Sequence, residues 1–235
     1  MTLFDSPRPH APLPQRIARP SPWMLITLLA ALAGTALSAA FAVFAGVALH
    51  GVIDGDSGFL TAPQAELHSA LSLYEKAGRF QGGAYLACAV VFLFWFLGMR
   101  RATGPLAPDR FRHGTGWAIG SWFIPIAHFW LPYRIAFDMW GAASPLPTGG
   151  QAYRAPLWPV NLWWGLFVSN VLFSRYAAMR FDTADNLTEL RDAVRLYLVC
   201  DSLEILAAGA AVFFAVRLTA MRDRKVTQGP YLATV

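Results

Sequence analysis

The stretch from Trp23 to Leu49 contains no charged residue, and it constrains the fold more than any other feature of the chain. Its 27 residues would form a helix about 40 Å long, which exceeds the roughly 30 Å hydrocarbon core of a bilayer. It is also far longer than the apolar region of a cleaved signal peptide. Because 56% of all residues are hydrophobic and only 14% are charged, the sequence predicts an all-α, polytopic membrane protein with a retained first span.

Three further apolar runs, residues 82–99, 157–176 and 196–216, are predicted to cross the bilayer. The amphipathic stretch 62–80 is expected to join the first of them as one long helix whose first half stands outside the membrane. The predicted organisation has three parts: a disordered, basic, proline-rich cytoplasmic tail (1–22), a helical transmembrane domain (23–221) and a basic C-terminal tail (222–235).

The segment 116–140 is rich in tryptophan and proline and has two possible paths. Its marked residues are Trp117, Trp122, Pro125, Trp130, Pro132 and Trp140. If it enters and leaves by one face, as a re-entrant or interfacial segment, four spans place 13 Lys and Arg inside and 6 outside. If it crosses, there are five full spans and the split is 11 to 8. Charge favours the four-span topology with a cytoplasmic N-terminus, whereas the length of the segment favours the five-span alternative. The tryptophans are expected to anchor at the membrane interface, and a stacking site for an aromatic or lipid ligand is the alternative.

Small residues recur at every fourth position in the first apolar run, at Gly34, Ser38, Ala42 and Gly46. Such a ridge lets another helix approach closely in a membrane. The sequence therefore predicts helix packing along this face.

The last apolar run contains two acidic residues, Asp201 and Glu204, at a spacing that places them on one helix face. Ionisable groups at membrane depth are functional candidates, usually paired or facing a wet cavity. The alternative is that both lie near the headgroups and pair with Arg175 or Arg180.

A second polar set consists of His128, Asn161 and Asn170. Amides within membrane helices commonly bond across to another helix, and a histidine is more often a satisfied core residue than a proton shuttle. The sharper hypothesis is that His128 and Asn161 meet Asp201 and Glu204 in one polar cavity.

Other chemistry is not indicated by the sequence. Cys88 and Cys200 each lie inside an apolar run, which is typical of packing residues. There is no HExxH, GxSxG, P-loop or CxxC pattern, so no cofactor, metal or catalytic residue is expected. The net charge of +5 comes mostly from arginines near the ends of apolar runs, where lipid headgroups and topology explain it without nucleic acid.

Three blocks, FLFWFLGMRRA at 92–102, GTGWAIGSWFIPIAHFWLPYRIAFDMWGAA at 114–143 and LWPVNLWWGLFVSNVLF at 157–173, resemble the domain-of-unknown-function 4328 family. The middle block is the most specific. The resemblance covers roughly 60–220 and implies a multi-span protein of the bacterial, mainly actinobacterial, plasma membrane. It implies no activity.

These observations favour a noncatalytic scaffold or regulator of a membrane complex. Its expected partners are the lipid bilayer and either another membrane protein or a second copy of the chain. The alternative is a small transporter or channel subunit with a path through Asp201, Glu204 and His128, and a third option is an enzyme that uses the paired carboxylates on lipid.

Overall fold

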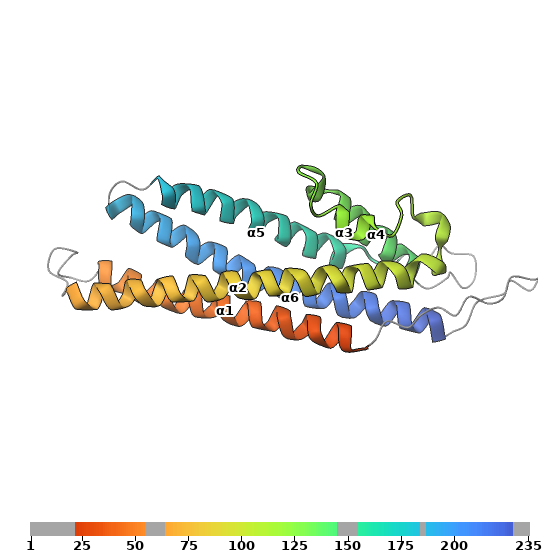
Figure 1. Ribbon diagram of the computed structural model, residues 1–235, viewed down its shortest axis with the longest axis horizontal. Helices are drawn as coiled ribbons and strands as arrows, with labels where there is room; N and C mark the ends of the chain where they lie inside the picture. Colours follow the sequence, from red (N-terminus) through yellow and green to blue (C-terminus); the bar gives the residue numbers. More distant parts are fainter. Residues whose placement is uncertain (1–21, 55–63, 145–154, 184–186, 228–235) are drawn as a thin grey trace, which may run out of the picture.

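The structure is a computed structural model that describes residues 22–54, 64–144, 155–183 and 187–227. Within these ranges the secondary structure is helical and contains no strand, which confirms the predicted all-α class. Long helices run lengthwise (Figure 1), namely α1 (Pro22–Asp54), α2 (Gln64–Thr103), α5 (Trp158–Asp182) and α6 (Leu187–Thr227). The shorter elements are η1 (Gly104–Leu106), η2 (Pro108–Arg110), α3 (Trp117–Gly120), η3 (Ala127–Phe129) and α4 (Leu131–Ala143).

Among the described residues, three helices are long and apolar enough to cross a membrane: α1, α2 and α6. α5, which contains residues 158–176 of the predicted span 157–176, is not among them. The 40 residues of α2 and the 41 of α6 correspond to about 60 Å each, about twice the hydrocarbon thickness. Each therefore has room for a span and a further helical part beyond it. The expected continuity of the amphipathic stretch with the second apolar run is confirmed from residue 64 onward, since α2 is a single helix, and residues 62 and 63 lie outside the described residues.

The helix ends fall into two groups (Figure 1). The end of α1 and the start of α2 lie at one end of the molecule, together with the end of α5 and the start of α6. The opposite end holds the start of α1 and the ends of α2 and α6, with α3 and α4 beside them. Neighbouring long helices are consequently antiparallel.

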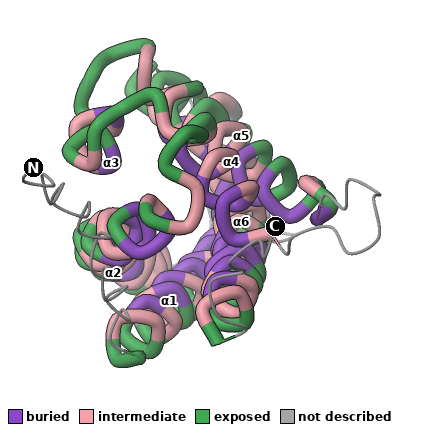
Figure 2. The backbone as a smooth tube through the Cα atoms, turned by 90° about the vertical axis from the view of Figure 1, so that its right-hand side faces the viewer, coloured by how far each residue is buried: buried purple, intermediate pink, exposed green. Residues whose placement is uncertain are grey.

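Packing among the long helices is uneven. α1 packs along both α2 and α6, and α6 packs along α5. The pair α2 and α5 is not among these extensively packed pairs, and the end-on view shows the two helices standing apart (Figure 2). A four-helix arrangement in which one neighbouring pair does not close leaves a space between that pair for side chains or a ligand.

The tryptophan- and proline-rich segment is not one helix. α3 ends at Gly120, a turn follows, and a short 3-10 helix precedes α4. Pro125 has no backbone N–H to donate, and Ile126 has a φ of 67°, which lies in the left-handed region that a β-branched residue rarely adopts. The straight 21-residue helix on which the five-span alternative depends is therefore not formed.

The first and last long helices each include residues of the predicted tails. Pro22 is the first residue of α1, and the rest of the N-terminal tail lies outside the described residues. α6 continues to Thr227, so the helix includes residues 222–227 of the predicted C-terminal tail.

A stack of aromatic rings forms the centre of the core. Trp163 of α5 lies parallel to Phe214 of α6, with ring centroids 4.4 Å apart and an interplanar angle of 3°. Trp140 of α4 stacks on the same phenylalanine at 6.1 Å, and Phe92 of α2 approaches Trp163 at 5.7 Å. These rings join α2, α4, α5 and α6 at one level of the bundle.

The small residues predicted to form a packing ridge on α1 differ in how closely other helices approach them. Ser38, Ala42 and Gly46 are buried. A Cβ atom added at Gly46 would meet Cδ2 of Leu198 at 2.7 Å, whereas one added at Gly34 would have no atom within 4 Å. A Cβ atom at position 46 would therefore require the Leu198 side chain to move, whereas one at position 34 would require no movement.

We expect Gly46→Leu to lower the free energy of unfolding by about 1–3 kcal/mol, because the added side chain must displace Leu198 of α6. Gly34→Leu is the matched control and should stay within about 0.5 kcal/mol of the parent protein. Unfolding by sodium dodecyl sulfate in mixed micelles, followed by circular dichroism, measures both. Equal losses for the two variants would contradict this assignment.

Candidate functional site

The two acidic residues of the last apolar run share one partner. Asp201 and Glu204 lie on the same face of α6, and Nε2 of Gln81, on α2, donates to Asp201 Oδ1 at 2.8 Å and to Glu204 Oε2 at 2.7 Å. A single amide group therefore links both carboxylates to a second helix.

Neither carboxylate has a cationic partner in the part of the chain that the structure describes. Within the described residues, no lysine or arginine forms an ion pair within 4 Å of Asp201 or Glu204, although Arg175 lines the same cavity. The expected pairing with Arg175 or Arg180 is thus not observed. Asp201 is only 5% exposed, and Oε1 of Glu204 is buried without a hydrogen-bond partner. Buried acceptors of this kind are costly unless a donor reaches them.

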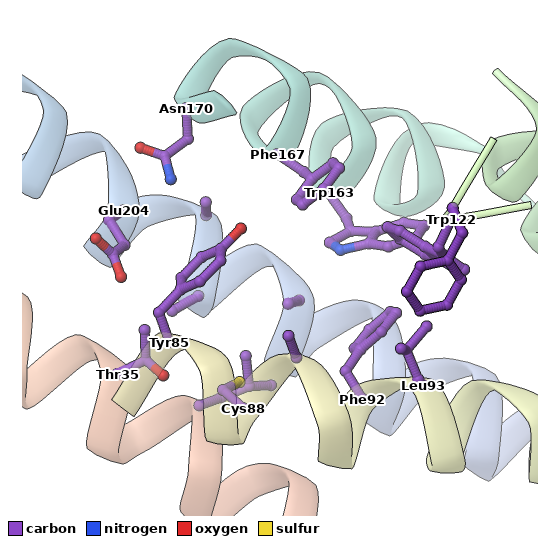
Figure 3. A pocket seen from close by; sticks show the side chains of 16 residues that line it. Thr35, Tyr85, Cys88, Phe92, Leu93, Trp122, Trp163, Phe167, Asn170 and Glu204 are labelled. Atoms are coloured by element: carbon purple, nitrogen blue, oxygen red, sulfur yellow. The ribbon is translucent and has the colours of Figure 1, made fainter. Parts of the chain in front are cut away.

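Asn170 of α5 faces the carboxylates from the other side. Its side chain is 7% exposed, and its Oδ1 is buried and accepts no hydrogen bond. Figure 3 shows the amide directed into the space that Glu204 and Tyr85 also border. The cavity-lining residues Asn170 of α5 and Glu204 of α6 therefore each carry an acceptor atom that the described part of the protein leaves unsatisfied.

An apolar cavity of about 230 Å³ begins at these residues. Rings and alanines form most of its wall, and Figure 3 shows Phe92, Trp122, Trp163 and Phe167 at the end far from Glu204. It lies between α2 and α5 with Ala207, Ala208 and Ala211 of α6 as its floor. The small alanine side chains leave volume free above α6. Because α2 and α5 do not pack closely, this volume is not filled by their side chains.

A second, more polar cavity of about 680 Å³ adjoins the first. Tyr85, Asn170 and Glu204 line both cavities. The polar cavity is also lined by Gln81 and Asp201 and by further aromatic rings, those of Tyr74, Phe181 and Tyr197. We call the two adjoining cavities the α2–α5 groove. It is apolar at one end and rich in acceptors at the other, which is the pattern of a site for an amphipathic molecule.

Two residues of the hypothesised polar cavity lie elsewhere. His128 lies in η3 with its ring 3.9 Å from that of Phe129, and Asn161 accepts a hydrogen bond from the Tyr133 hydroxyl at 2.8 Å. Neither lines the two cavities of the groove. The structure brings Asp201, Glu204 and Asn170 together, and it does not bring His128 or Asn161 to them.

The tryptophans of 116–140 divide into two kinds. Trp117 and Trp130 are exposed, as are Pro125 and its neighbour Ile126. Trp122 instead packs edge-on against other rings and borders the groove, at 5.6 Å from Phe92.

The remaining members of the segment belong to α4. Trp140 is fully buried in the core, and Pro132 is buried in the first turn of α4, where proline is tolerated. One face of the segment therefore supplies exposed apolar side chains, and the other closes the apolar end of the groove.

The opposite, basic end of the molecule contains the acidic residue Asp138 on α4. Burial raises the pKa of its carboxyl, and the nearby positive charges of Arg134, Arg110 and Arg100 oppose this rise. Close by, Lys225 of α6 donates to the carbonyl oxygens of Ala142 and Ser144, at 2.8 and 2.9 Å, and so binds the C-terminal end of α4. These contacts hold α4 against α6, and they are separate from the groove.

Sequence reasoning missed Gln81 and Tyr85. Both lie where the amphipathic half of α2 meets its apolar half, one just before and one just after the pair Gly82 and Gly83. A glutamine at the edge of a predicted span was the available signal, but its partner lies 120 residues away in the sequence.

Comparison with known proteins gives one match. The model of the family described as Domain of unknown function (DUF4328) matches residues 61–220. No curated protein matches the chain, and no solved structure does. The matched range includes all residues of the groove that α2, α5 and α6 contribute.

Proposed function

The chain belongs to the DUF4328 family, and we propose that it is a four-span membrane protein that binds an amphipathic molecule from the bilayer in the α2–α5 groove. This is a binding function, suited to a scaffold or regulator. The groove residues offer acceptors and ring faces that hold and orient a molecule, and the sequence carries no motif for turnover.

The four-span topology is supported by the arrangement of the helix ends. The segment 116–143 leaves and rejoins the bundle at the same end, so α5 is antiparallel to α2 and counts as the third span (Figure 1). The arginines that follow α2 and those at the end of α6 lie at this end, which the positive-inside rule places in the cytoplasm together with the N-terminus. We propose that this membrane is the plasma membrane, as the family resemblance implies.

This topology sets the depth of the groove. Glu204 precedes Arg217 by 13 residues, which is about 20 Å of helix in a hydrocarbon core of roughly 30 Å. The carboxylates would lie in the outer half of the bilayer, with the polar cavity toward the outer surface and the apolar cavity toward the centre. An amphipathic molecule of the outer leaflet would thus bind with its polar group toward the outer surface and its apolar part toward the bilayer centre.

The observation that carries the proposal is the junction of the two cavities at Tyr85, Asn170 and Glu204. A purely structural polar cluster would satisfy its own acceptors, whereas here Oε1 of Glu204 and Oδ1 of Asn170 lack partners beside an apolar space. The transport alternative is less well supported, because His128 lines neither cavity.

Photo-crosslinking in lipid nanodiscs tests the proposal. The probes are a twelve-carbon amine and a twelve-carbon alcohol, each with a diazirine in its chain, and labelled peptides are mapped by mass spectrometry. We expect at least one probe to label the groove-facing parts of α2 and α5 saturably. Ala207→Phe fills the apolar cavity and should reduce this labelling about tenfold.

The matched control is Leu206→Phe. Leu206 is the neighbouring residue, but it is 60% exposed and does not line the apolar cavity, so labelling should be unchanged. If both probes label without saturation, and Ala207→Phe has no more effect than Leu206→Phe, the groove is not a binding site and the proposal is wrong.

A further inference from the structure

We infer that the ligand of the α2–α5 groove is an amphipathic amine, whose positively charged ammonium group sits among Asp201, Glu204 and Asn170 and whose hydrocarbon or aromatic part occupies the apolar cavity. This inference rests on the proposed function and names its ligand class.

First, the residues at the junction of the two cavities carry hydrogen-bond acceptors that the described part of the protein does not satisfy. Gln81 already directs its amide donor group at both carboxylates. Glu204 Oε1 and Asn170 Oδ1 remain as buried acceptors without a donor. A primary ammonium group carries three N–H donors and no acceptor, so its chemistry matches a site whose unsatisfied atoms are acceptors. A head group with acceptors only would leave them unsatisfied.

The second step is charge. Asp201 and Glu204 are both acidic, and no described lysine or arginine pairs with them. Two more charged side chains line the polar cavity, Glu75 and Arg175, and both are exposed and opposite in sign. The inner end of the polar cavity therefore holds two carboxyl groups and no cationic side chain among the described residues. An ammonium ion there would stabilise their ionised forms, whereas an anion would oppose ionisation.

The third step is the aromatic wall. Tyr74, Tyr85 and Tyr197 line the polar cavity beside the carboxylates. The faces of such rings attract cations within about 6 Å of the centroid. Acceptors and rings around one space are a combination that suits an ammonium ion better than a neutral alcohol.

The fourth step is the order of the two cavities. Glu204 borders the apolar cavity itself, so the cation must follow directly on the hydrophobic part of the ligand. In an amino phospholipid a phosphate lies between the acyl chains and the ammonium group, and the phosphate would then face Glu204. The apolar cavity of about 230 Å³ exceeds the roughly 150 Å³ that accommodates benzene. A phosphate-free amine whose alkyl or aryl part begins in this cavity fits both conditions.

Competition in nanodiscs tests this inference. The diazirine-bearing twelve-carbon amine is the labelled probe, and the competitors are dodecylamine, dodecyltrimethylammonium, dodecanol, dodecanoate and a short-chain phosphatidylethanolamine. On the unmodified protein we expect dodecylamine to compete best, about tenfold better than dodecanol. Dodecyltrimethylammonium, which has the charge without the donors, should be intermediate. Dodecanoate and phosphatidylethanolamine should be weakest.

The variant with both Asp201→Asn and Glu204→Gln should lose the preference for dodecylamine over dodecanol and retain binding of dodecanol. Glu75→Gln removes an exposed carboxylate at the outer part of the same cavity, and it should keep the preference. If the double variant does not fold, the competitor series on the unmodified protein still decides the question.

Two results would overturn the inference while leaving the proposed function intact. One is equal competition by dodecanol or dodecanoate, and the other is a preference for phosphatidylethanolamine. An amine preference that persists in the folded double variant would also overturn it, because the carboxylates would then not be the site of the cation. A failure of the proposed function is distinct, since no competitor of any charge would displace the label.

Discussion

Trp163→Ala is expected to lower the free energy of unfolding by about 3–5 kcal/mol, the range for removing a large buried aromatic side chain. Trp163 is 2% exposed, and its ring lies parallel to that of Phe214 at 4.4 Å. It also contacts Trp164 at 5.4 Å and Phe92 at 5.7 Å. Truncation would leave a void where α2, α5 and α6 meet, and it would enlarge the apolar cavity of the groove.

Trp158→Ala is the matched control for this prediction. Trp158 is also on α5 and also stacks on a ring of α6, that of Phe213 at 5.1 Å, but it is 53% exposed. Its loss should be about 1 kcal/mol, because only the ring contact is removed and no buried void is created. Unfolding in mixed micelles measures both variants. Equal losses would show that the stack around Phe214 is not the centre of the core.

Gln81→Leu is expected to cost about 2–3 kcal/mol, because it removes both hydrogen bonds to the carboxylates and deprives the buried Asp201 of this donor. The leucine side chain is close in size, so packing is largely preserved. The same unfolding measurement applies, and a loss below about 1 kcal/mol would contradict the linking role of Gln81.

Asn161→Leu is the control for the loss of an amide. Asn161 is exposed and accepts a single hydrogen bond, from Tyr133, so its replacement should change stability by less than about 1 kcal/mol. Combining Gln81→Leu with Asp201→Asn and Glu204→Gln should recover part of the loss. The two introduced amides carry both donors and acceptors, and they remove the two negative charges.

The helical class and the long helices could be predicted from the sequence because they depend on local properties. Apolar runs predicted membrane helices where α1, α2 and α6 are found to be long and apolar enough to cross. The spacing of Asp201 and Glu204 correctly placed them on one helix face. These conclusions need only residue polarity and the 3.6-residue period of the helix.

The groove could not be predicted, because it depends on which helices fail to pack. No local sequence pattern predicts that α2 and α5 stand apart. Nor does any predict that Gln81 bonds to Asp201 and Glu204, which are more than one hundred positions away in the sequence. The change of chain direction at Pro125 and Ile126 could be predicted only in part. Proline signals a break, but the positive φ falls on Ile126, a residue type that gives no such signal.

The prediction that His128 and Asn161 share a cavity with the carboxylates rested on residue type alone, and the structure places both residues elsewhere. His128 and Asn161 were grouped with the carboxylates because polar residues in apolar segments tend to meet. The bend in 116–140 instead leaves His128 beside Phe129, and Asn161 near the start of α5 is exposed and paired with Tyr133. Asn170, one of two amides on the same helix, is the one that faces the groove.

The central claim is that α2 and α5 hold an amphipathic molecule between them. A structure determined in a lipid mesophase with added dodecylamine tests it most directly. The account predicts elongated density that starts between Glu204 and Asn170 and extends past Phe92 toward Trp122. Side chains of α2 and α5 in direct contact across this space, with Glu204 and Asn170 satisfied by protein donors and no density between the helices, would contradict it.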